Sequence, residues 1–283
     1  MPTDFTRVTS PLPNPTIPGQ YQLELDGNWN APINPHGGLV AAIGVRAMEM
    51  ELAIPEQTLR SVNTVFVSPI LEGKVIVDVT VLRKGRSISQ AMALVRNEGS
   101  SSGLIATAIF GSVRDGYSFV DLVAPIVPPP DKCRSFWDNP PRDFHRQFEP
   151  TFWYRVEGRS AIGHAPWESW EPTTSEKAVW HQFKQVPFLP DGTLDPLALV
   201  TLCDTMPGAV GEKVGPGQPV WVAPSTDLTV HLGTPTTSEW ILGYSKAHWA
   251  SEGYASLDIS LWDPLGKLLA YGTQVCFFHF PGI

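Results

Sequence analysis

Alternating apolar and polar residues dominate the chain and predict antiparallel strands. Between Ser61 and Val113 the alternating runs are rich in Val and Ile and have Gly at their turns: "NTVFVSP", "KVIVDVTVLRKGRSISQAMALVRNEG" and "SGLIATAIFGSV". Three later runs follow the same pattern: "STDLTVHL", "EWILGYSKAHWASEGYASLDISLWD" and "KLLAYGTQVCFFHF". Shorter strands are predicted at "YQLELDGNWN", "FEPTFWYRVEG" and "KAVWHQFKQ".

Two apolar runs interrupt this alternation and predict helices. The first extends from about Leu39 to Leu52, and Pro55 ends it. The second, "LDPLALVTLCDTMPGAV", starts at Asp195-Pro196, a favourable N-cap and first-turn pair. Pro207 predicts that this second helix ends or kinks within one turn of Asp204. A helix that is apolar nearly all round needs cover on most of its sides.

The order of elements repeats along the chain. When the sequence is aligned with itself, 63–110 lies over 227–274 without gaps, and "SSGLIATAIFG" lies over "LGKLLAYGTQV". This predicts a duplicated α+β unit. About five strands wrapped around one central helix is the hotdog arrangement, so two tandem units would make a double hotdog.

Changes of composition predict four segments. Residues 1–20 are Pro-rich and polar and are expected to form an N-terminal tail without an apolar signal core. The first unit is expected at 21–124, a Pro-rich linker at 125–147 and the second unit at 148–283.

Composition and charge narrow the class of protein. The chain has 283 residues, and its apolar fraction of 42% is enough for a packed core. The net charge of −8 argues against nucleic acid as a partner. No apolar run is long enough for a membrane helix, and three scattered cysteines suit neither a disulfide framework nor a metal site. We expect a cytoplasmic protein with a small-molecule ligand and without membrane partner or cofactor. A homo-oligomer stays open, because a double hotdog already contains its own pseudo-dimer.

Several segments resemble one known family. "VLRKGRSIS" (81–89) and "HGG" before the first helix are similar to signatures of the acyl-CoA thioesterase II (TesB-like) family, as are "EWILGYS" and "GTQ" (272–274) in the second half. The resemblance implies a double hotdog hydrolase of lipid metabolism that cleaves acyl-CoA. Three places differ from relatives, and they leave the acyl specificity and some CoA contacts open: "GGLVAAIGV", "QAMALV" and the strand after Ser225.

The resemblance implies a catalytic trio of Asp204, Ser225 and Gln274. A carboxylate, a hydroxyl and a carboxamide can together hold and deprotonate a water molecule that attacks a thioester. No G-x-S-x-G nucleophile motif is present in the sequence. Strict alternation would instead put the Thr226 hydroxyl on the inner face of its strand, so Thr226 remains an alternative to Ser225.

Two further groups could contact the substrate. His36 could act as a base or position its loop, while Gly37 and Gly38 could offer free backbone N–H groups to an oxyanion at a helix start. Arg83, Lys84 and Arg86 could contact the CoA phosphates or form a solvated turn. The Trp-rich region from Trp137 to Trp180 either lines an acyl tunnel or clamps the linker onto the core.

The repeat predicts one working site per chain. In the gapless alignment, the positions of Asp204, Ser225 and Gln274 fall on Val40, Ser61 and Phe110. The site would therefore combine the glycines of the first half with the trio of the second. Two other functions remain alternatives: a non-hydrolytic dehydratase or cyclase-like enzyme acting on a polyketide or acyl thioester, and a non-catalytic acyl-binding protein.

Overall fold

One antiparallel sheet organises the protein. The computed structural model describes residues 3–31, 33–138, 150–165, 167–216 and 221–280. Within these residues the sheet has 13 strands in the order β1-β2-β4-β5-β6-β3-β10-β13-β12-β11-β9-β8-β7. The first half contributes β1 (Leu12–Pro13), β2 (Gln20–Leu25), β3 (Thr58–Phe66), β4 (Gly73–Arg83), β5 (Ile88–Asn97) and β6 (Leu104–Gly111). The second half contributes β7 (Arg134–Ser135), β8 (Val156–Ile162), β9 (Glu176–Phe183), β10 (Asp227–Leu232), β11 (Ile241–Ser251), β12 (Tyr254–Trp262) and β13 (Leu268–Phe277).

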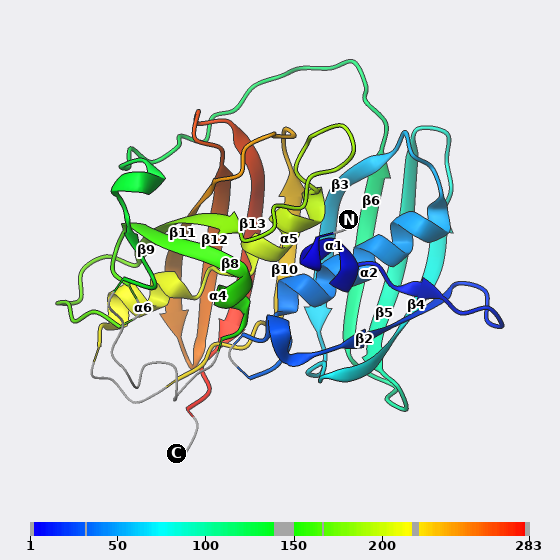
Figure 1. The fold of residues 1–283 in the computed structure, drawn as a ribbon, viewed down its shortest axis with the longest axis horizontal. Coiled ribbons are helices and arrows are strands. Elements are labelled where there is room, and N and C mark those ends of the chain that lie inside the picture. The colour runs from blue at the N-terminus through cyan, green and yellow to red at the C-terminus, as the bar shows by residue number, and fades with distance from the viewer. Residues whose placement is uncertain (1–2, 32, 139–149, 166, 217–220, 281–283) are drawn as a thin grey trace.

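Two central helices lie side by side against the sheet (Figure 1). Helix α2 (Gly37–Leu52) packs on the first half and α5 (Pro196–Cys203) on the second. Every described side chain of α5 except that of Pro196 is buried, as an apolar helix requires. The smaller helices are α1 (Asp4–Val8), η1 (Gly27–Trp29), η2 (Pro130–Lys132), α4 (Phe152–Arg155) and α6 (Gly208–Val214). This α+β double hotdog confirms the predicted fold class.

The two halves are related by a repeat, and strand pairing defines its register. Leu59 pairs with Phe110 in the first half, and Ser225 bridges Cys276 in the second, so Leu59 is the counterpart of Ser225. The hairpins β4–β5 and β11–β12 correspond in the same register. The predicted alignment, which puts Ser61 over Ser225, is therefore shifted by two residues, which is one repeat of the pleated strand. The halves join edge to edge through the antiparallel pair β3–β10.

The N-terminal segment differs from the expected tail. Helix α1 buries Phe5, whose ring lies 5.9 Å from Trp29 and 5.1 Å from Phe183. The side chain of Asp4 accepts a hydrogen bond from Arg155 at 2.8 Å. These contacts fasten the beginning of the chain across both halves.

The connection between the halves follows β6 and runs over one end of the molecule (Figure 1). The predicted linker extends to residue 147, and its last part, together with residues 148–149 of the predicted second unit, lies outside the described residues. In the described part of the strand predicted at "FEPTFWYRVEG", helix α4 comes first, and β8 follows only from Val156 onward.

Candidate active site

Asp204 stands where the second central helix stops. It is the C-cap of α5, and α6 begins four residues later at Gly208 with Pro207 as its N-cap. The predicted helix end within one turn of Asp204 is thus confirmed, since proline at position 207 cannot continue the hydrogen-bond ladder. The Asp204 side chain is only 7% exposed. A buried carboxylate needs polar partners, since unpaired charge in a protein interior is costly.

Four hydrogen bonds bring the predicted trio together. Oδ1 of Asp204 accepts from Ser225 Oγ at 2.9 Å and from Gln274 Nε2 at 2.5 Å. Gln274 Nε2 also donates to Ser225 Oγ at 2.5 Å. The backbone N–H of Gly38 donates to Oδ2 of Asp204 at 2.8 Å. One carboxylate therefore joins the start of α2, the end of α5 and the last strand of the second half.

The neighbouring hydroxyl of Thr226 has a different partner. Thr226 Oγ1 donates to the carbonyl of Val275 at 2.8 Å, beside the strand, whereas Ser225 faces Asp204. Ser225 lies just before β10, so the alternation that would place Thr226 inward has not yet begun. The geometry therefore selects Ser225 as the hydroxyl beside the carboxylate.

The glycines at the start of α2 allow the two helices to approach closely. A Cβ on Gly38 would stand 2.7 Å from the Thr201 carbonyl oxygen and 2.9 Å from Asp204 Cβ. A Cβ on Gly37 would stand 2.8 Å from both Asp204 Oδ2 and Phe66 Cε1. Gly38 is needed for helix contact, and Gly37 leaves space directly beside the carboxylate.

His36 is the N-cap residue of α2 and is buried next to Asp204. Its ring stacks on Phe152 with centroids 4.2 Å apart, and its Nδ1 lies 3.7 Å from Asp204 Oδ2. Burial lowers the pKa of the imidazole, and the nearby Asp204 charge opposes that shift only in part. The neutral form is therefore favoured near pH 7, and the ring contributes packing and an unprotonated nitrogen.

A cavity of about 740 Å³ opens beside these residues. His36, Gly37, Asp204 and Ser225 line it. Gln274 does not, and its side chain is 1% exposed, so it lies behind the carboxylate rather than in the cavity wall. The remaining wall is largely apolar and includes Phe66, Phe152, Trp153, Trp221 and Phe277, of which Trp153 is the one tryptophan from the predicted Trp-rich region. Such a cavity is large enough for an acyl chain of substantial size.

The other tryptophans of that region mainly hold the connection. Trp180 Nε1 donates to the Pro128 carbonyl at 2.9 Å, and Trp167 Nε1 donates to the Phe136 carbonyl at 2.7 Å. Sequence patterns alone do not separate these clamping residues from the cavity residue Trp153, because both kinds are aromatic and pack against the core.

Arg83, Lys84 and Arg86 lie away from this cavity. They form the turn between β4 and β5, at the end of those strands opposite to Gly73 and Asn97. Ile70, which precedes β4, lines the cavity, whereas the turn contacts Gln57 through the Gly85 carbonyl. Any contact that these three residues make with CoA would therefore lie outside the Asp204 cavity.

The described residues contain neither a metal cluster nor a membrane-spanning helix. Among them, no group of three or more His, Cys, Asp or Glu side chains is placed to hold a metal ion. Within the same part of the chain, no helix combines the length and the apolar character needed to cross a bilayer.

Comparison with known proteins identifies relatives for the entire double unit. A model of the acyl-CoA thioesterase N-terminal domain matches residues 25–111, and one of the acyl-CoA thioesterase C-terminal domain matches residues 130–278. No curated protein matches the chain.

Solved structures share the fold. A hot dog fold protein of unknown function from Alicyclobacillus acidocaldarius superposes with a TM-score of 0.81 at 23% identity, covering 99% of this chain and 100% of its own. The acyl-CoA thioesterase II TesB2 from Mycobacterium marinum superposes with a TM-score of 0.73 at 18% identity, covering 98% and 99%. The tesB protein of Mycobacterium avium subs paratuberculosis has a TM-score of 0.74 at 15% identity, covering 98% of each chain.

Proposed function

We propose that this chain, which belongs to the acyl-CoA thioesterase family as a TesB-like double hotdog, hydrolyses acyl-CoA thioesters. In this proposal Asp204 holds the water molecule that attacks the thioester. The observation that carries this proposal is the Asp204 carboxylate in the cavity wall, oriented by donors from Ser225, Gln274 and Gly38. A carboxylate fixed in this way can accept a proton from water without having to reorganise.

The proposed nucleophile is a water molecule in the space beside Gly37. Glycine keeps this side of the carboxylate clear, because a Cβ at position 37 would stand only 2.8 Å from both Asp204 Oδ2 and Phe66 Cε1. Gly37, Asp204 and Ser225 share the cavity wall there. Gln274 acts as a positioning residue, because its amide reaches Asp204 and Ser225 from behind the wall.

The reaction then proceeds in two steps. Water attacks the thioester carbonyl carbon as its proton passes to Asp204, and the carbonyl oxygen becomes an oxyanion. Gly38 N–H is already bonded to Asp204, so Gly37 N–H is the proposed backbone donor to that oxygen. Collapse of the intermediate breaks the C–S bond, and the proton on Asp204 passes to the departing sulfur. The products are the free acid and the thiol of CoA.

An isotope experiment tests this function against non-hydrolytic chemistry. The purified protein is incubated with acyl-CoAs of several chain lengths in ¹⁸O-labelled water, and thiol release and the mass of the acid are measured. We expect thiol release with one ¹⁸O atom incorporated into the acid at each turnover. A dehydratase or cyclase would change the acyl group without releasing thiol in proportion, and a binding protein would release none.

A further inference from the structure

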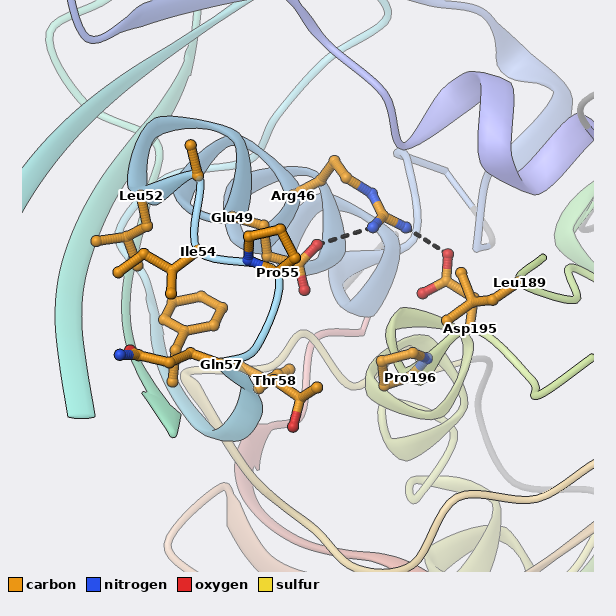
Figure 2. A pocket seen from close by; sticks show the side chains of 13 residues that line it. Arg46, Glu49, Leu52, Ile54, Pro55, Gln57, Thr58, Leu189, Asp195 and Pro196 are labelled. Carbon is orange, nitrogen blue, oxygen red and sulfur yellow. Dashed lines mark hydrogen bonds and ion pairs between the residues drawn. The ribbon is translucent and has the colours of Figure 1, made fainter. Parts of the chain in front are cut away.

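A second cavity occupies the repeat-related position in the other half of the fold. It has a volume of about 270 Å³ and lies at the opposite ends of the same two helices (Figure 2). The N-cap of α5, Asp195, lines it just as the N-cap of α2, His36, lines the Asp204 cavity. Leu59, the repeat counterpart of Ser225, also lines it.

This second cavity lacks the hydrolytic groups. The register of the repeat places Gln274 on Ala108 and Ser225 on Leu59. Counting from the two helix N-caps, the position of Asp204 in α5 corresponds to Val45 in α2. All three counterparts are buried apolar residues. The described lining of the cavity therefore has no counterpart of the Asp204–Ser225–Gln274 arrangement that is proposed to activate water.

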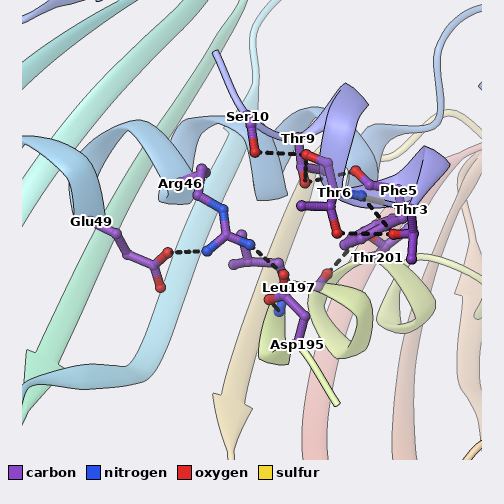
Figure 3. Close-up of polar contacts among 10 residues, drawn as sticks. All are labelled: Thr3, Phe5, Thr6, Thr9, Ser10, Arg46, Glu49, Asp195, Leu197 and Thr201. Atoms are coloured by element: carbon purple, nitrogen blue, oxygen red, sulfur yellow. Dashed lines mark hydrogen bonds and ion pairs between the residues drawn. The ribbon is translucent and has the colours of Figure 1, made fainter. Parts of the chain in front are cut away.

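Three charged side chains, those of Arg46, Glu49 and Asp195, form one side of the cavity (Figures 2 and 3). Arg46 Nη1 donates to Glu49 Oε2 at 2.8 Å, and Nη2 donates to Asp195 Oδ2. The other oxygen of Asp195 caps α5 by accepting from the Leu197 N–H at 3.0 Å. Arg46 already donates to both acidic side chains, and Asp195 is its buried ionic partner, so the cavity interior does not favour an additional anion.

The same lining has one unpaired donor and one unpaired acceptor. Within the described part of the chain, Arg46 Nε and Gln57 Oε1 are buried and have no hydrogen-bond partner. Gln57 is 7% exposed, and its Nε2 donates to the Gly85 carbonyl at 2.8 Å. Buried polar atoms normally find partners, and a ligand that carries an amide supplies both an acceptor and a donor.

The surface beside Gln57 is basic although the chain is acidic. Of the five charged residues in segments 55–60 and 82–88, one is acidic, Glu56, and four are basic: Arg60, Arg83, Lys84 and Arg86. All four basic side chains are exposed, and Gln57 links the turn that carries the last three to the cavity wall. Such a cluster is suited to phosphate groups, which Arg and Lys bind strongly.

We propose that this second cavity binds a phosphopantetheine group without hydrolysing it, with the amide-bearing arm inside and the phosphate at the basic turn. This inference rests on the proposed function, since a protein that acts on acyl-CoA encounters this group on its substrate. The volume is too small for the whole of CoA, so the remainder of CoA or of a carrier protein would stay outside.

Calorimetric titration of the full chain with free CoA tests the second site. We expect two CoA molecules per wild-type chain and only one per chain in the Lys84→Glu/Arg86→Glu variant, with affinity at the lost site weakened at least about tenfold. The Lys132→Glu/Lys267→Glu variant has the same change of charge on exposed residues outside segments 55–60 and 82–88 and should keep both sites. The Gln57→Leu variant should weaken the same site without changing surface charge.

The outcomes separate this proposal from the proposed function. The second site alone is overturned if the wild-type chain releases thiol but binds a single CoA, and if the Lys84→Glu/Arg86→Glu variant binds that CoA with the same affinity. Two CoA molecules bound without thiol release would instead overturn the hydrolase and leave the second site standing. Competition at the second site by free 4′-phosphopantetheine supports CoA as the source, and competition only by a holo carrier protein identifies the carrier.

Discussion

The backbone N–H of Gly38 donates a 2.8 Å hydrogen bond to Oδ2 of Asp204, a residue of the other repeat. This bond joins the beginning of one central helix to the end of the other. The candidate active site is therefore a contact between the two repeats, and each repeat supplies a part that the other lacks.

Gly38→Ala is expected to impair both stability and activity. The new Cβ would stand 2.7 Å from the Thr201 carbonyl oxygen, and that backbone atom cannot rotate away as a side chain could. We expect a loss of about 1–3 kcal/mol in the free energy of unfolding, measured by denaturant titration, together with lower thiol release. Gly211→Ala in α6 is the matched control, because nothing lies within 4 Å of its Cβ position; equal loss in both variants would contradict the close-contact explanation.

Ser225→Ala and Thr226→Val should affect different properties. Ser225 donates to Asp204, so its removal should lower kcat by about 10–100-fold with little change in stability. Thr226 donates to a backbone carbonyl, so its replacement should cost about 1 kcal/mol of stability and leave kcat nearly unchanged. Steady-state kinetics and thermal unfolding of both variants check this assignment, and the reverse pattern would make Thr226 the site hydroxyl.

Glu49 should make stability dependent on pH. Burial raises the pKa of its carboxyl to about 7, although Arg46 opposes the shift. Between the ordinary pKa of 4.5 and about 7, the unfolded chain releases this proton while the folded chain keeps it. The contribution of Glu49 to the unfolding free energy therefore falls as pH rises through that range, by up to about 3 kcal/mol.

Glu49→Gln tests this sign directly. The amide cannot ionise and still offers an oxygen to Arg46, so the variant should be more stable than the wild type at pH 8 and similar at pH 4.5. Denaturant unfolding at a series of pH values measures the difference. A difference that is constant over this range would show that Glu49 is ionised throughout in the folded protein.

The Arg46–Asp195 pair should be strongly coupled. Asp195 is 2% exposed, and Arg46→Met would leave its charge buried without a cationic partner, at a cost of about 3–5 kcal/mol. Asp195→Asn keeps a side-chain oxygen for the N-cap of α5, so the double variant should recover much of the loss. A double-mutant cycle of unfolding free energies checks this, and additive losses would show that the pair is not coupled.

The sequence predicted the double hotdog, both central helices and the trio that meets at Asp204, because each has a local signal in periodicity, capping or family motif. It did not define the register of the repeat: strand faces alternate with a period of two, so a shift of one pleat leaves the same faces inward. Partners across the sheet decide between the two registers, as Leu59 and Phe110 show. The placement of Arg83 far from Asp204 and the burial of Phe5 also depend on contacts between distant segments, which no local pattern records.

The most direct test of the central claim compares thiol release by the wild type and by Asp204→Asn. Asparagine has the same shape but only one side-chain oxygen, so it can accept either from Ser225 and Gln274 or from Gly38, and it cannot take a proton from water. We predict a fall in kcat of about 100-fold or more, with KM changed by no more than a few-fold and a loss of about 1–3 kcal/mol in the free energy of unfolding for the donor left without an acceptor. A variant that retains kcat within about threefold of the wild type would contradict the role of Asp204 as the base that activates water.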